Sequence, residues 1–228
     1  MEKENRVNPI KPKAIGKKIW HFLWEEDSAW SWIANIVLAF VLIKFAVYPV
    51  LGFLLNTQFP IVAVVSGSME HKIASDDAGH LSLCGQWFKV KVPVDLDKFW
   101  ETCGWWYEQN TVIGKDDFTD FQFSGGFNKG DIMVLYGKKP GDIRVGEVIV
   151  FRSRRPDPII HRVVKVTQEN GTYYFQTKGD HNEKVIKSPM LDESKIPQDQ
   201  VLGNAVFRIP FFGYIKIWFV ELINLFIK

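Results

Sequence analysis

Residues 145–177 read VGEVIVFRSRRPDPIIHRVVKVTQENGTYYFQT, and this stretch decides the fold class. It contains three runs rich in β-branched and aromatic residues, Glu147–Phe151, Ile159–Val166 and Thr172–Thr177. Such runs, bounded by turn-forming residues, are typical of short strands. The turn signals are Arg155-Pro-Asp-Pro158 and Asn170-Gly171, and Asn-Gly between two strand-like runs predicts a hairpin. The stretch therefore predicts consecutive antiparallel strands.

Runs of the same kind lie on both sides of this stretch. They are Ile61–Val65, Asp131–Tyr136 and Val201–Arg208. The chain shows neither an internal repeat nor the alternation of strands and helices that forms parallel sheets. We therefore predict a mainly β fold, in which residues 57–69 and 129–208 form an antiparallel sandwich or partly closed β-barrel.

Residues 70–128 differ in composition and are predicted to be an insertion between two strands. They are rich in aromatic and acidic residues, and Asp95 is placed to cap a helix that extends to about Tyr107. Along that helix, apolar residues recur at helical spacing: Phe99, Trp100, Cys103 and Trp106. We interpret the aromatic residues as packing within an α-containing insertion rather than as a ligand-binding site.

Both cysteines of the chain, Cys84 and Cys103, lie in this insertion. The alternatives are a disulfide, two free thiols, or a zinc site completed by His71 and His80. The paired spacing that is typical of structural zinc sites is absent from the sequence, so we expect no metal, and we expect no cofactor.

From Trp30 to Leu55 the chain is almost wholly apolar, interrupted chiefly by Asn35 and Lys44. A membrane span needs about 20 apolar residues, so this run predicts a transmembrane helix over residues 30–56. A buried core helix and a cleaved signal peptide are the alternatives. The run is too long for either, and it begins too far from the N-terminus for a signal peptide.

Basic residues are concentrated in residues 1–29, and the next Lys or Arg after the span is Lys72. The positive-inside rule then places the N-terminal segment in the cytoplasm and the β domain outside. The protein is accordingly expected to be integral to the cell membrane.

The chain ends in a second apolar stretch, residues 209–228, which contains Lys216 and Glu221. Apolar residues cover nearly all faces of the helix that this stretch would form. We predict an apolar C-terminal helix that either spans the membrane or lies in its plane, with a soluble core helix as the remaining alternative.

The composition excludes a nucleic-acid-binding protein and a disordered chain. The 28 Lys and Arg against 26 Asp and Glu give a net charge of +2, which lacks the strongly basic character that nucleic-acid binding requires. A hydrophobic content of 46% is ample for a packed core and excludes a disordered chain.

A candidate nucleophile follows the run Ile61–Val65, in the sequence Ser66-Gly-Ser68-Met69. A serine acts as a nucleophile only when a base lies within hydrogen-bond reach. Among the histidines, His161 lies inside a strand-like run between apolar neighbours. A histidine in that setting is usually structural, so these residues indicate a serine hydrolase only if Ser68 faces His161.

The Ser-Gly-Ser-Met sequence directly after an N-terminal anchor resembles the type I signal peptidase family. Further motifs follow in the order of that family: Lys129-Gly-Asp-Ile132, Val145-Gly-Glu-Val-Ile-Val-Phe151, Ile160-His-Arg-Val163, Thr177-Lys-Gly-Asp180, Val201-Leu-Gly203 and Arg208-Ile-Pro-Phe-Phe-Gly-Tyr-Ile-Lys216. The resemblance covers about residues 56–69 and 129–216. Bacterial members carry a lysine at the place of His161, and a histidine there is similar to the archaeal and eukaryotic type.

The resemblance implies a role for each matching residue. Ser68 would attack the scissile carbonyl, and His161 would be its general base and later the acid for the leaving amine. Asp180 would orient or support the site. The Ser66 hydroxyl and the Ser68 backbone N–H would form the oxyanion hole. The substrate would bind as an extended strand on the exposed sheet edge.

The sequence departs from the family pattern in two places. Glu70-His71 follows Met69 where the family usually has x-Pro. Serine–histidine members also usually carry a second aspartate six residues after Asp180, and here that position is Ile186. Either Asp180 suffices, or Asp192 reaches the site, or the acid is weakened. We favour Asp180, because it follows a glycine in the turn directly after a strand-like run.

These observations together predict a membrane-bound serine endopeptidase that cleaves N-terminal signal peptides from exported proteins at the outer face of the membrane. Its expected partners are preproteins, the lipid bilayer and the protein-export machinery, without nucleic acid. The alternative is a catalytically silent, membrane-anchored β module that binds signal-peptide-like segments. A serine–lysine dyad using Lys165 ranks last, because that residue lies about 13 Å along the strand from His161.

Overall fold

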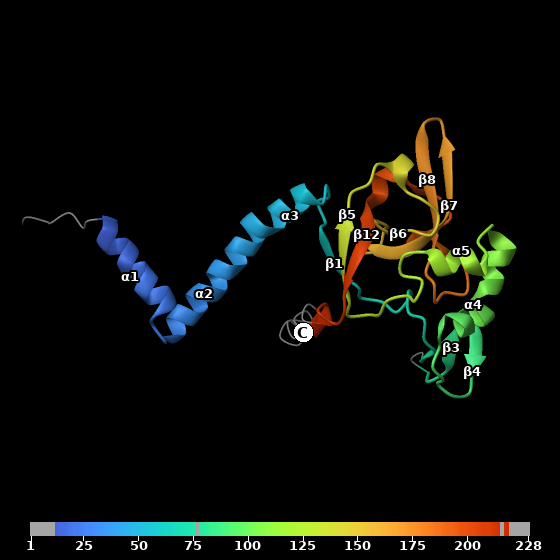
Figure 1. Cartoon of the computed structure of the whole chain (residues 1–228), viewed down its shortest axis with the longest axis horizontal. Helices are drawn as coiled ribbons and strands as arrows, with labels where there is room; N and C mark the ends of the chain where they lie inside the picture. The colour runs from blue at the N-terminus through green and yellow to red at the C-terminus, as the bar shows by residue number, and fades with distance from the viewer. Residues whose placement is uncertain (1–11, 76–77, 215–216, 219–228) are drawn as a thin grey trace, which may run out of the picture. The chain divides into compact units, whose positions relative to one another are not determined.

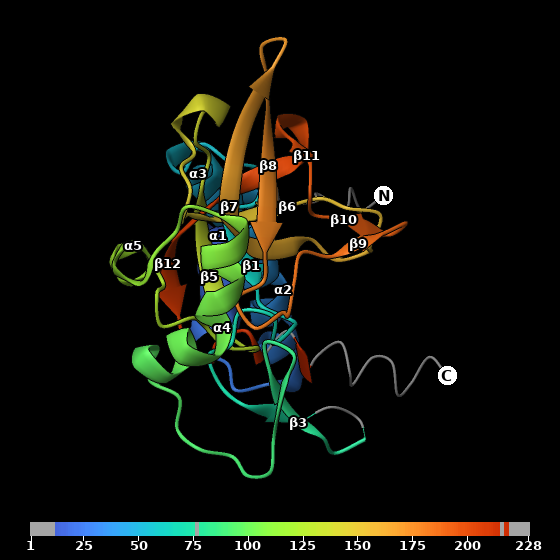
Figure 2. The ribbon, with the colours of Figure 1, turned by 90° about the vertical axis from the view of Figure 1, so that its right-hand side faces the viewer.

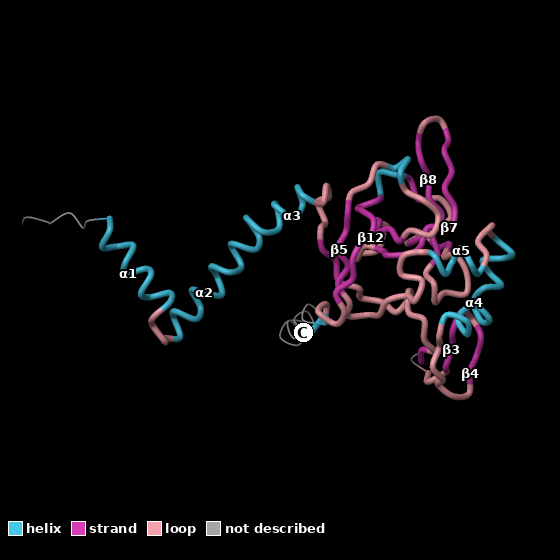
Figure 3. The backbone as a smooth tube through the Cα atoms, in the orientation of Figure 1, coloured by secondary structure: helices cyan, strands magenta, loops and turns pink. Residues whose placement is uncertain are grey.

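The computed structural model describes residues 12–75, 78–214 and 217–218 (Figure 1). The chain divides into two compact units, Met1–Leu51 and Gly52–Lys228. The described part of the first unit is mainly helical, whereas the second contains the β-sheet and the aromatic-rich insertion (Figure 3).

The described elements of the N-terminal unit are helices α1 (Pro12–Trp24) and α2 (Ala29–Leu42), a π-helical turn (Ile43–Val47) and the start of helix α3 (Tyr48–Leu54). Ser28 caps α2, because its side chain accepts a hydrogen bond from the Ser31 backbone N–H at 3.2 Å. Two polar side chains then fasten α2 to α1. The Ser31 hydroxyl donates to the Phe22 carbonyl at 2.6 Å, and the Asn35 amide donates to the Leu23 carbonyl at 2.8 Å. These bonds explain why polar residues occur in an otherwise apolar helix.

Helix α2, the π-helical turn and helix α3 form one continuous helix, Ala29–Leu54, of 26 residues. It is about 39 Å long at 1.5 Å per residue. Within the described ranges it is the one helix long and apolar enough to cross a membrane. Large apolar side chains along it are exposed, including Phe40 and Phe53, as expected for a helix that contacts lipid rather than a protein core. The π-helical turn lies just before Pro49, which lacks the N–H and the clearance that a regular helix interior needs.

The body of the second unit is a single seven-stranded sheet. Its strands lie in the order β1 (Ile61–Ala63), β5 (Ile132–Tyr136), β12 (Val201–Ile209), β6 (Val148–Phe151), β7 (Ile159–Glu169), β8 (Thr172–Lys178) and β11 (Ile196–Pro197). All neighbouring strands are antiparallel. The sheet curls into a half-barrel, from which the β7–β8 hairpin extends (Figure 2). The prediction of a mainly antiparallel, partly closed β fold is confirmed.

Irregularities in the strands produce the curl. The register of β12 shifts between Val201 and Gly203 and again between Ala205 and Phe207. Such bulges bend a strand and increase its twist. The β7–β8 hairpin turns at Asn170 and Gly171, whose φ angles of 49° and 81° are those of a type I′ turn.

Strand β6 is buried on both faces of the sheet, because successive side chains of a strand point in opposite directions. Val148 and Val150 belong to one apolar cluster together with Leu135 of β5. Ile149 and Phe151 belong to a second cluster on the other side. The run around β6 is therefore continuously apolar rather than alternating.

Further strands and helices complete the unit. They are β2 (Ala74–Ser75), β3 (Leu81–Leu83), β4 (Gln86–Phe88), helix α4 (Leu96–Asn110), helix α5 (Lys115–Asp120), β9 (Lys187–Ser188), β10 (Leu191–Asp192) and two 3₁₀ turns (Pro140–Asp142 and Gln198–Gln200). Asp95 caps α4 as predicted, since its carboxylate accepts a hydrogen bond from the Lys98 N–H at 2.8 Å. The aromatic face of α4 packs with α5 against Val164 of β7. The insertion therefore shares one core with the sheet.

The two cysteines of the insertion are joined. Cys84 and Cys103 form a disulfide with an S–S distance of 2.03 Å, so the alternatives of free thiols and of a zinc site do not apply. His71, a ligand in the zinc alternative, instead contacts Asp180. No group of three metal-ligating side chains occurs among the described residues.

Strand β12 ends at Ile209 and is followed by a turn. The predicted C-terminal apolar helix, residues 209–228, lies largely outside the described residues, as do Lys216 and Glu221. Whether it spans the membrane stays a prediction, as do the domain boundaries given above.

Candidate active site

Ser68 lies in a tight turn after strand β1, and this turn is held by backbone hydrogen bonds. The Glu70 N–H donates to the Gly67 carbonyl at 3.0 Å, which closes the turn. The Ser68 carbonyl accepts a hydrogen bond from the His181 N–H at 2.9 Å, and the Met69 carbonyl accepts one from the Phe127 N–H at 3.1 Å. The turn is therefore fixed from two sides without the proline that the family usually has there.

Glu70 stands where the sequence departs from that pattern, and its side chain adds to the same support. Its carboxylate is buried, accepts a hydrogen bond from the Lys129 N–H at 3.0 Å and pairs with Lys72 at 3.0 Å. A Cβ at Gly67 would stand 2.9 Å from this carboxylate, so any larger residue at position 67 would displace the Glu70 side chain.

His161 faces Ser68 from strand β7. Its Nε2 lies 2.8 Å from the Ser68 Oγ, within hydrogen-bond reach. The imidazole is buried, with 3% of the residue exposed, whereas Ser68 is half-buried. The structure therefore brings together the serine and the histidine that the sequence singled out.

The acid that touches His161 is Glu193, which the sequence reasoning missed. The Glu193 carboxylate forms a hydrogen bond with His161 Nδ1 and is fully buried. It also accepts hydrogen bonds from the Thr177 hydroxyl and from the Ile186 N–H, each at 2.9 Å. Glu193 is thus held in place by three donors, one of them the base itself.

Strand alternation explains why Glu193, and not Asp192, reaches the histidine. Leu191 of β10 is buried, Asp192 is exposed and Glu193 is buried, as successive residues of an extended chain point to opposite sides. The Asp192 carboxylate accepts hydrogen bonds from the N–H and the hydroxyl of Ser194, and these bonds lower its pKa. The alternation of Leu191, Asp192 and Glu193 is the sequence signal that indicates Glu193, whereas the family pattern leads to an aspartate.

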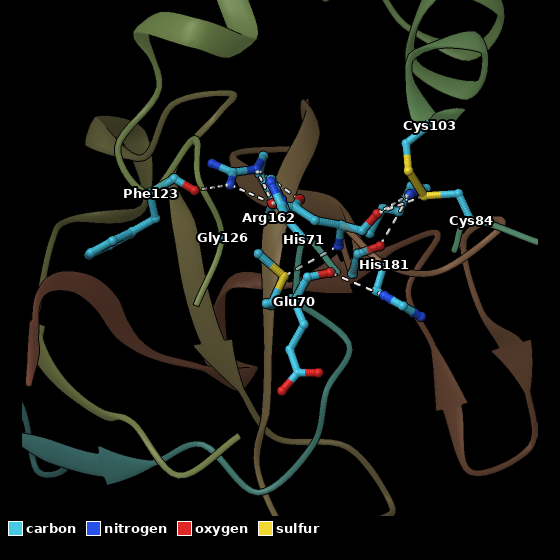
Figure 4. A network of polar contacts seen from close by, with 12 residues as sticks. Glu70, His71, Cys84, Cys103, Phe123, Gly126, Arg162 and His181 are labelled. Atoms are coloured by element: carbon cyan, nitrogen blue, oxygen red, sulfur yellow. Dashed lines mark hydrogen bonds and ion pairs between the residues drawn. A yellow bond between two sulfur atoms is a disulfide. The ribbon is translucent and has the colours of Figure 1, made fainter. Parts of the chain in front are cut away.

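Asp180, the acid favoured from sequence, lies in a different contact network, which includes Arg162 and His71 (both labelled in Figure 4). Its carboxylate binds the guanidinium of Arg162 at 2.6 and 2.9 Å. It also binds His71 Nε2 at 3.0 Å and the Tyr107 hydroxyl at 3.1 Å. Burial alone would raise the pKa of Asp180, but the Arg162 charge and these hydrogen bonds outweigh burial and hold the pKa well below its ordinary value. The predicted contact of Asp180 with His161 is therefore wrong.

Arg162 uses its remaining donors on backbone carbonyls. It donates to the carbonyls of Gln122, Phe123 and Gly146, each at 2.9 Å, and its side chain is fully buried. A buried guanidinium needs a counter-charge and a full set of acceptors. Asp180 supplies the charge, which explains why its carboxylate is unavailable to His161.

Lys178 holds the chain just before Asp180. Its buried ammonium donates to the carbonyls of Gly179 and Asp180, at 3.1 and 3.3 Å, and lies over the ring of Tyr107. Burial lowers the pKa of Lys178 to about 8, against the opposing effects of Asp180 and Glu193. Lys178 and Arg162 therefore both hold the loop that follows β8.

Ser66, the other predicted oxyanion-hole residue, lies beside the nucleophile. Its hydroxyl is 3.1 Å from the Ser68 Oγ and its side chain is exposed. A donor in this position can reach an oxygen on a carbon bonded to Ser68 Oγ. Its role stays a prediction.

Ser66, Ser68 and His161 open into a cavity of about 340 Å³. One wall comes from the β1 segment, with Ala63 and Val65. Residues 155–160, at the start of β7, also line the cavity. A peptide bound in this cavity would therefore lie next to Ser68 and His161.

Comparison with known proteins bears on this site. No family model matches the chain. The signal peptidase complex catalytic subunit SEC11C of Homo sapiens is 37% identical over 95 residues, which cover 40% of this chain and 49% of that protein. The SEC11 catalytic subunits of Colletotrichum graminicola and Plasmodium falciparum are 31% and 30% identical, over 42% of this chain and 57% and 53% of those proteins.

The chain is a homologue of signal peptidase complex catalytic subunits. The resemblance to the type I signal peptidase family is thereby confirmed, at modest identity. The chain spans about half the length of the curated relatives it matches.

The Arg162–Asp180 pair generates a prediction about stability. We expect Asp180→Asn to lower the free energy of unfolding by about 3–5 kcal/mol, because it leaves the buried guanidinium without a counter-charge. Because the pKa of Asp180 is depressed on folding, its contribution is complete above about pH 4 and is lost as the pH falls further. Denaturant unfolding of the two proteins between pH 2.5 and 7 measures both effects.

The matched control is Asp192→Asn, which removes an exposed carboxylate twelve residues later in the chain. This control should change the free energy of unfolding by less than about 0.5 kcal/mol. Equal stabilities of the two variants would contradict the structural role given to Asp180.

Proposed function

We propose that this protein is a membrane-anchored serine endopeptidase that removes signal peptides from preproteins. The observation that carries the proposal is the linear arrangement of Ser68, His161 and Glu193 beside an open cavity. Such an arrangement suits hydrolysis by a serine, because the serine is hydrogen-bonded to a base and an acid orients that base. The homology to signal peptidase catalytic subunits supports the substrate class.

The proposed reaction has two halves. Ser68 Oγ attacks the scissile carbonyl while His161 Nε2 takes the hydroxyl proton, and the same nitrogen then gives that proton to the leaving amine. A water molecule, deprotonated by His161, next hydrolyses the acyl-enzyme and restores Ser68. The Glu193 carboxylate accepts from Nδ1, which fixes the tautomer that leaves Nε2 free to act as a base.

The oxyanion of each tetrahedral intermediate would form next to the Ser68 Oγ. The Ser66 hydroxyl, 3.1 Å from that oxygen, and the Ser68 backbone N–H are the proposed donors. Preorganised donors at this point stabilise the charge that develops in the transition state.

The substrate would bind as an added strand along β1. Strand β1 is at the edge of the sheet, so its outer backbone groups are free of a sheet partner in the described residues. Main-chain hydrogen bonds along such an edge give affinity for any extended sequence. The apolar lining around Ala63, Val65 and Ile186 suits small apolar side chains next to the cleaved bond.

We further propose that helix Ala29–Leu54 anchors the protein in the cell membrane with the catalytic domain outside. The Lys and Arg residues that precede the span support this orientation. The Cys84–Cys103 disulfide is further support, because disulfides persist in oxidising compartments. Lipid, preproteins, export machinery and the other subunits of a signal peptidase complex are the proposed partners.

The catalytic proposal is tested with the full chain in detergent and a radiolabelled preprotein. Ser68→Ala should reduce kcat by about 10⁴- to 10⁶-fold, and His161→Ala by a similar factor. The double variant should be no slower than either single variant, because the two residues act as one unit. Ser124→Ala is the control and should cleave at the wild-type rate.

Two results would contradict the catalytic proposal. One is cleavage by Ser68→Ala at more than a tenth of the wild-type rate. The other is wild-type protein that binds a signal peptide without cleaving it, which would favour the silent β module instead.

The orientation is tested by adding a protease outside spheroplasts that carry an N-terminally tagged chain. The β domain should be digested, while the tag and residues 1–25 survive until the membrane is permeabilised. A tag that is removed from intact spheroplasts, or a β domain that is protected in them, would reverse the orientation.

A further inference from the structure

The side chain of Asn182 is the starting point. Its Nδ2 is buried and makes no hydrogen bond within the described part of the structure. Its backbone, in contrast, is fixed, because the Asn182 N–H donates to the Gly179 carbonyl at 2.9 Å. Buried polar atoms in native proteins are nearly always paired, so an unpaired donor on a rigid turn calls for an explanation.

Asn182 is next to the Ser68–His161 pair. It lines the cavity into which both residues open. A Cβ placed on Gly179 would stand 2.6 Å from Asn182 Nδ2, 2.8 Å from His161 Nε2 and 2.8 Å from the Ser68 carbonyl oxygen. All three atoms therefore surround one small space, which exists because residue 179 has no side chain.

The missing partner is expected to be an acceptor that enters the cavity with the substrate. An extended peptide presents a carbonyl oxygen at every residue, whatever its side chains are. A donor in the cavity wall can therefore bind substrates of varied sequence. An unpaired N–H in the free enzyme also has no internal hydrogen bond to give up when an acceptor reaches it.

We propose that Asn182 is a substrate-binding residue, whose side-chain amide donates a hydrogen bond to a main-chain carbonyl of the bound peptide beside the scissile bond. This inference rests on the proposed peptidase function. The bond is made to a carbonyl that does not react, so it stabilises the bound substrate and the transition state equally. Its loss should raise KM and leave kcat unchanged.

The test replaces Asn182 with leucine, which has a similar volume and no donor. Preprotein cleavage by the full chain in detergent should show KM raised about tenfold and kcat within a factor of two of wild type. The midpoint of thermal unfolding without substrate should be unchanged or higher, because an unpaired buried donor has been removed. Asn110→Leu is the control, since that amide caps its own helix by donating to the Trp106 carbonyl, and it should leave KM unchanged.

Binding without catalysis separates this inference from the proposed function. In a Ser68→Ala background, a signal peptide that spans the cleavage site should bind about tenfold more weakly when Asn182 is also leucine. Substrates in which single peptide bonds are replaced by an alkene then identify the carbonyl. The effect of Asn182→Leu should vanish for one such substrate and persist for the others.

Three outcomes would overturn the inference. The first is equal peptide affinity with and without Asn182, whether or not the wild type cleaves the preprotein. The second is a fall in kcat of about 100-fold at constant KM, which would make Asn182 an oxyanion donor instead. The third is a lower unfolding midpoint together with unchanged KM, which would make Asn182 a structural residue.

Discussion

A fully buried ion pair joins Arg162 of strand β7 to Asp180 of the loop that follows β8. Asp180 also contacts the segments that surround the active site. Asp180 binds His71 and Tyr107 of the insertion, and its backbone N–H contacts the Met69 sulfur at 3.4 Å. The pair therefore sets the loop against the turn that carries the nucleophile.

Adjacent residues of β7 then serve two separate acids. His161 and Arg162 are neighbours in the strand, so their side chains leave opposite faces. His161 meets Glu193 on one side, and Arg162 meets Asp180 on the other. Because His161 and Arg162 each have a carboxylate of their own, the acid that contacts His161 comes from a different segment than the Gly179-Asp180 motif.

The disulfide extends this arrangement into the insertion. The Cys84 backbone N–H donates to the His181 carbonyl at 3.1 Å, and the Cys84 sulfur lies 3.3 Å from the Asp180 carbonyl oxygen. The bond to Cys103 then ties this contact to helix α4. The insertion, although outside the family resemblance, thus supports the active-site loop.

Much of this could be predicted from local sequence. The strand-like runs, the Asn170-Gly171 turn and the Asp95 cap depend on neighbouring residues and were recognised. The pairing of Ser68 with His161 follows from the sequence only through the resemblance of the ordered motifs to a known family. The acid was missed because its identity depends on which side of a strand each carboxylate faces and on the prior claim of Arg162 on Asp180, and neither is visible in the linear sequence. The sequence shows only that Glu193 lies two residues after the apolar Leu191, a spacing that places both on one side of an extended chain.

The most direct test of the central claim compares two adjacent acids. Glu193→Gln keeps the shape of the side chain but can donate to His161 Nδ1, which stabilises the wrong tautomer. The rate of single-turnover cleavage of a preprotein in detergent should be about 10⁴-fold lower for Glu193→Gln than for the wild type, as loss of a triad acid predicts. The rate for Asp192→Asn should equal that of the wild type. Near-wild-type cleavage by Glu193→Gln would contradict the account and leave a Ser68–His161 dyad.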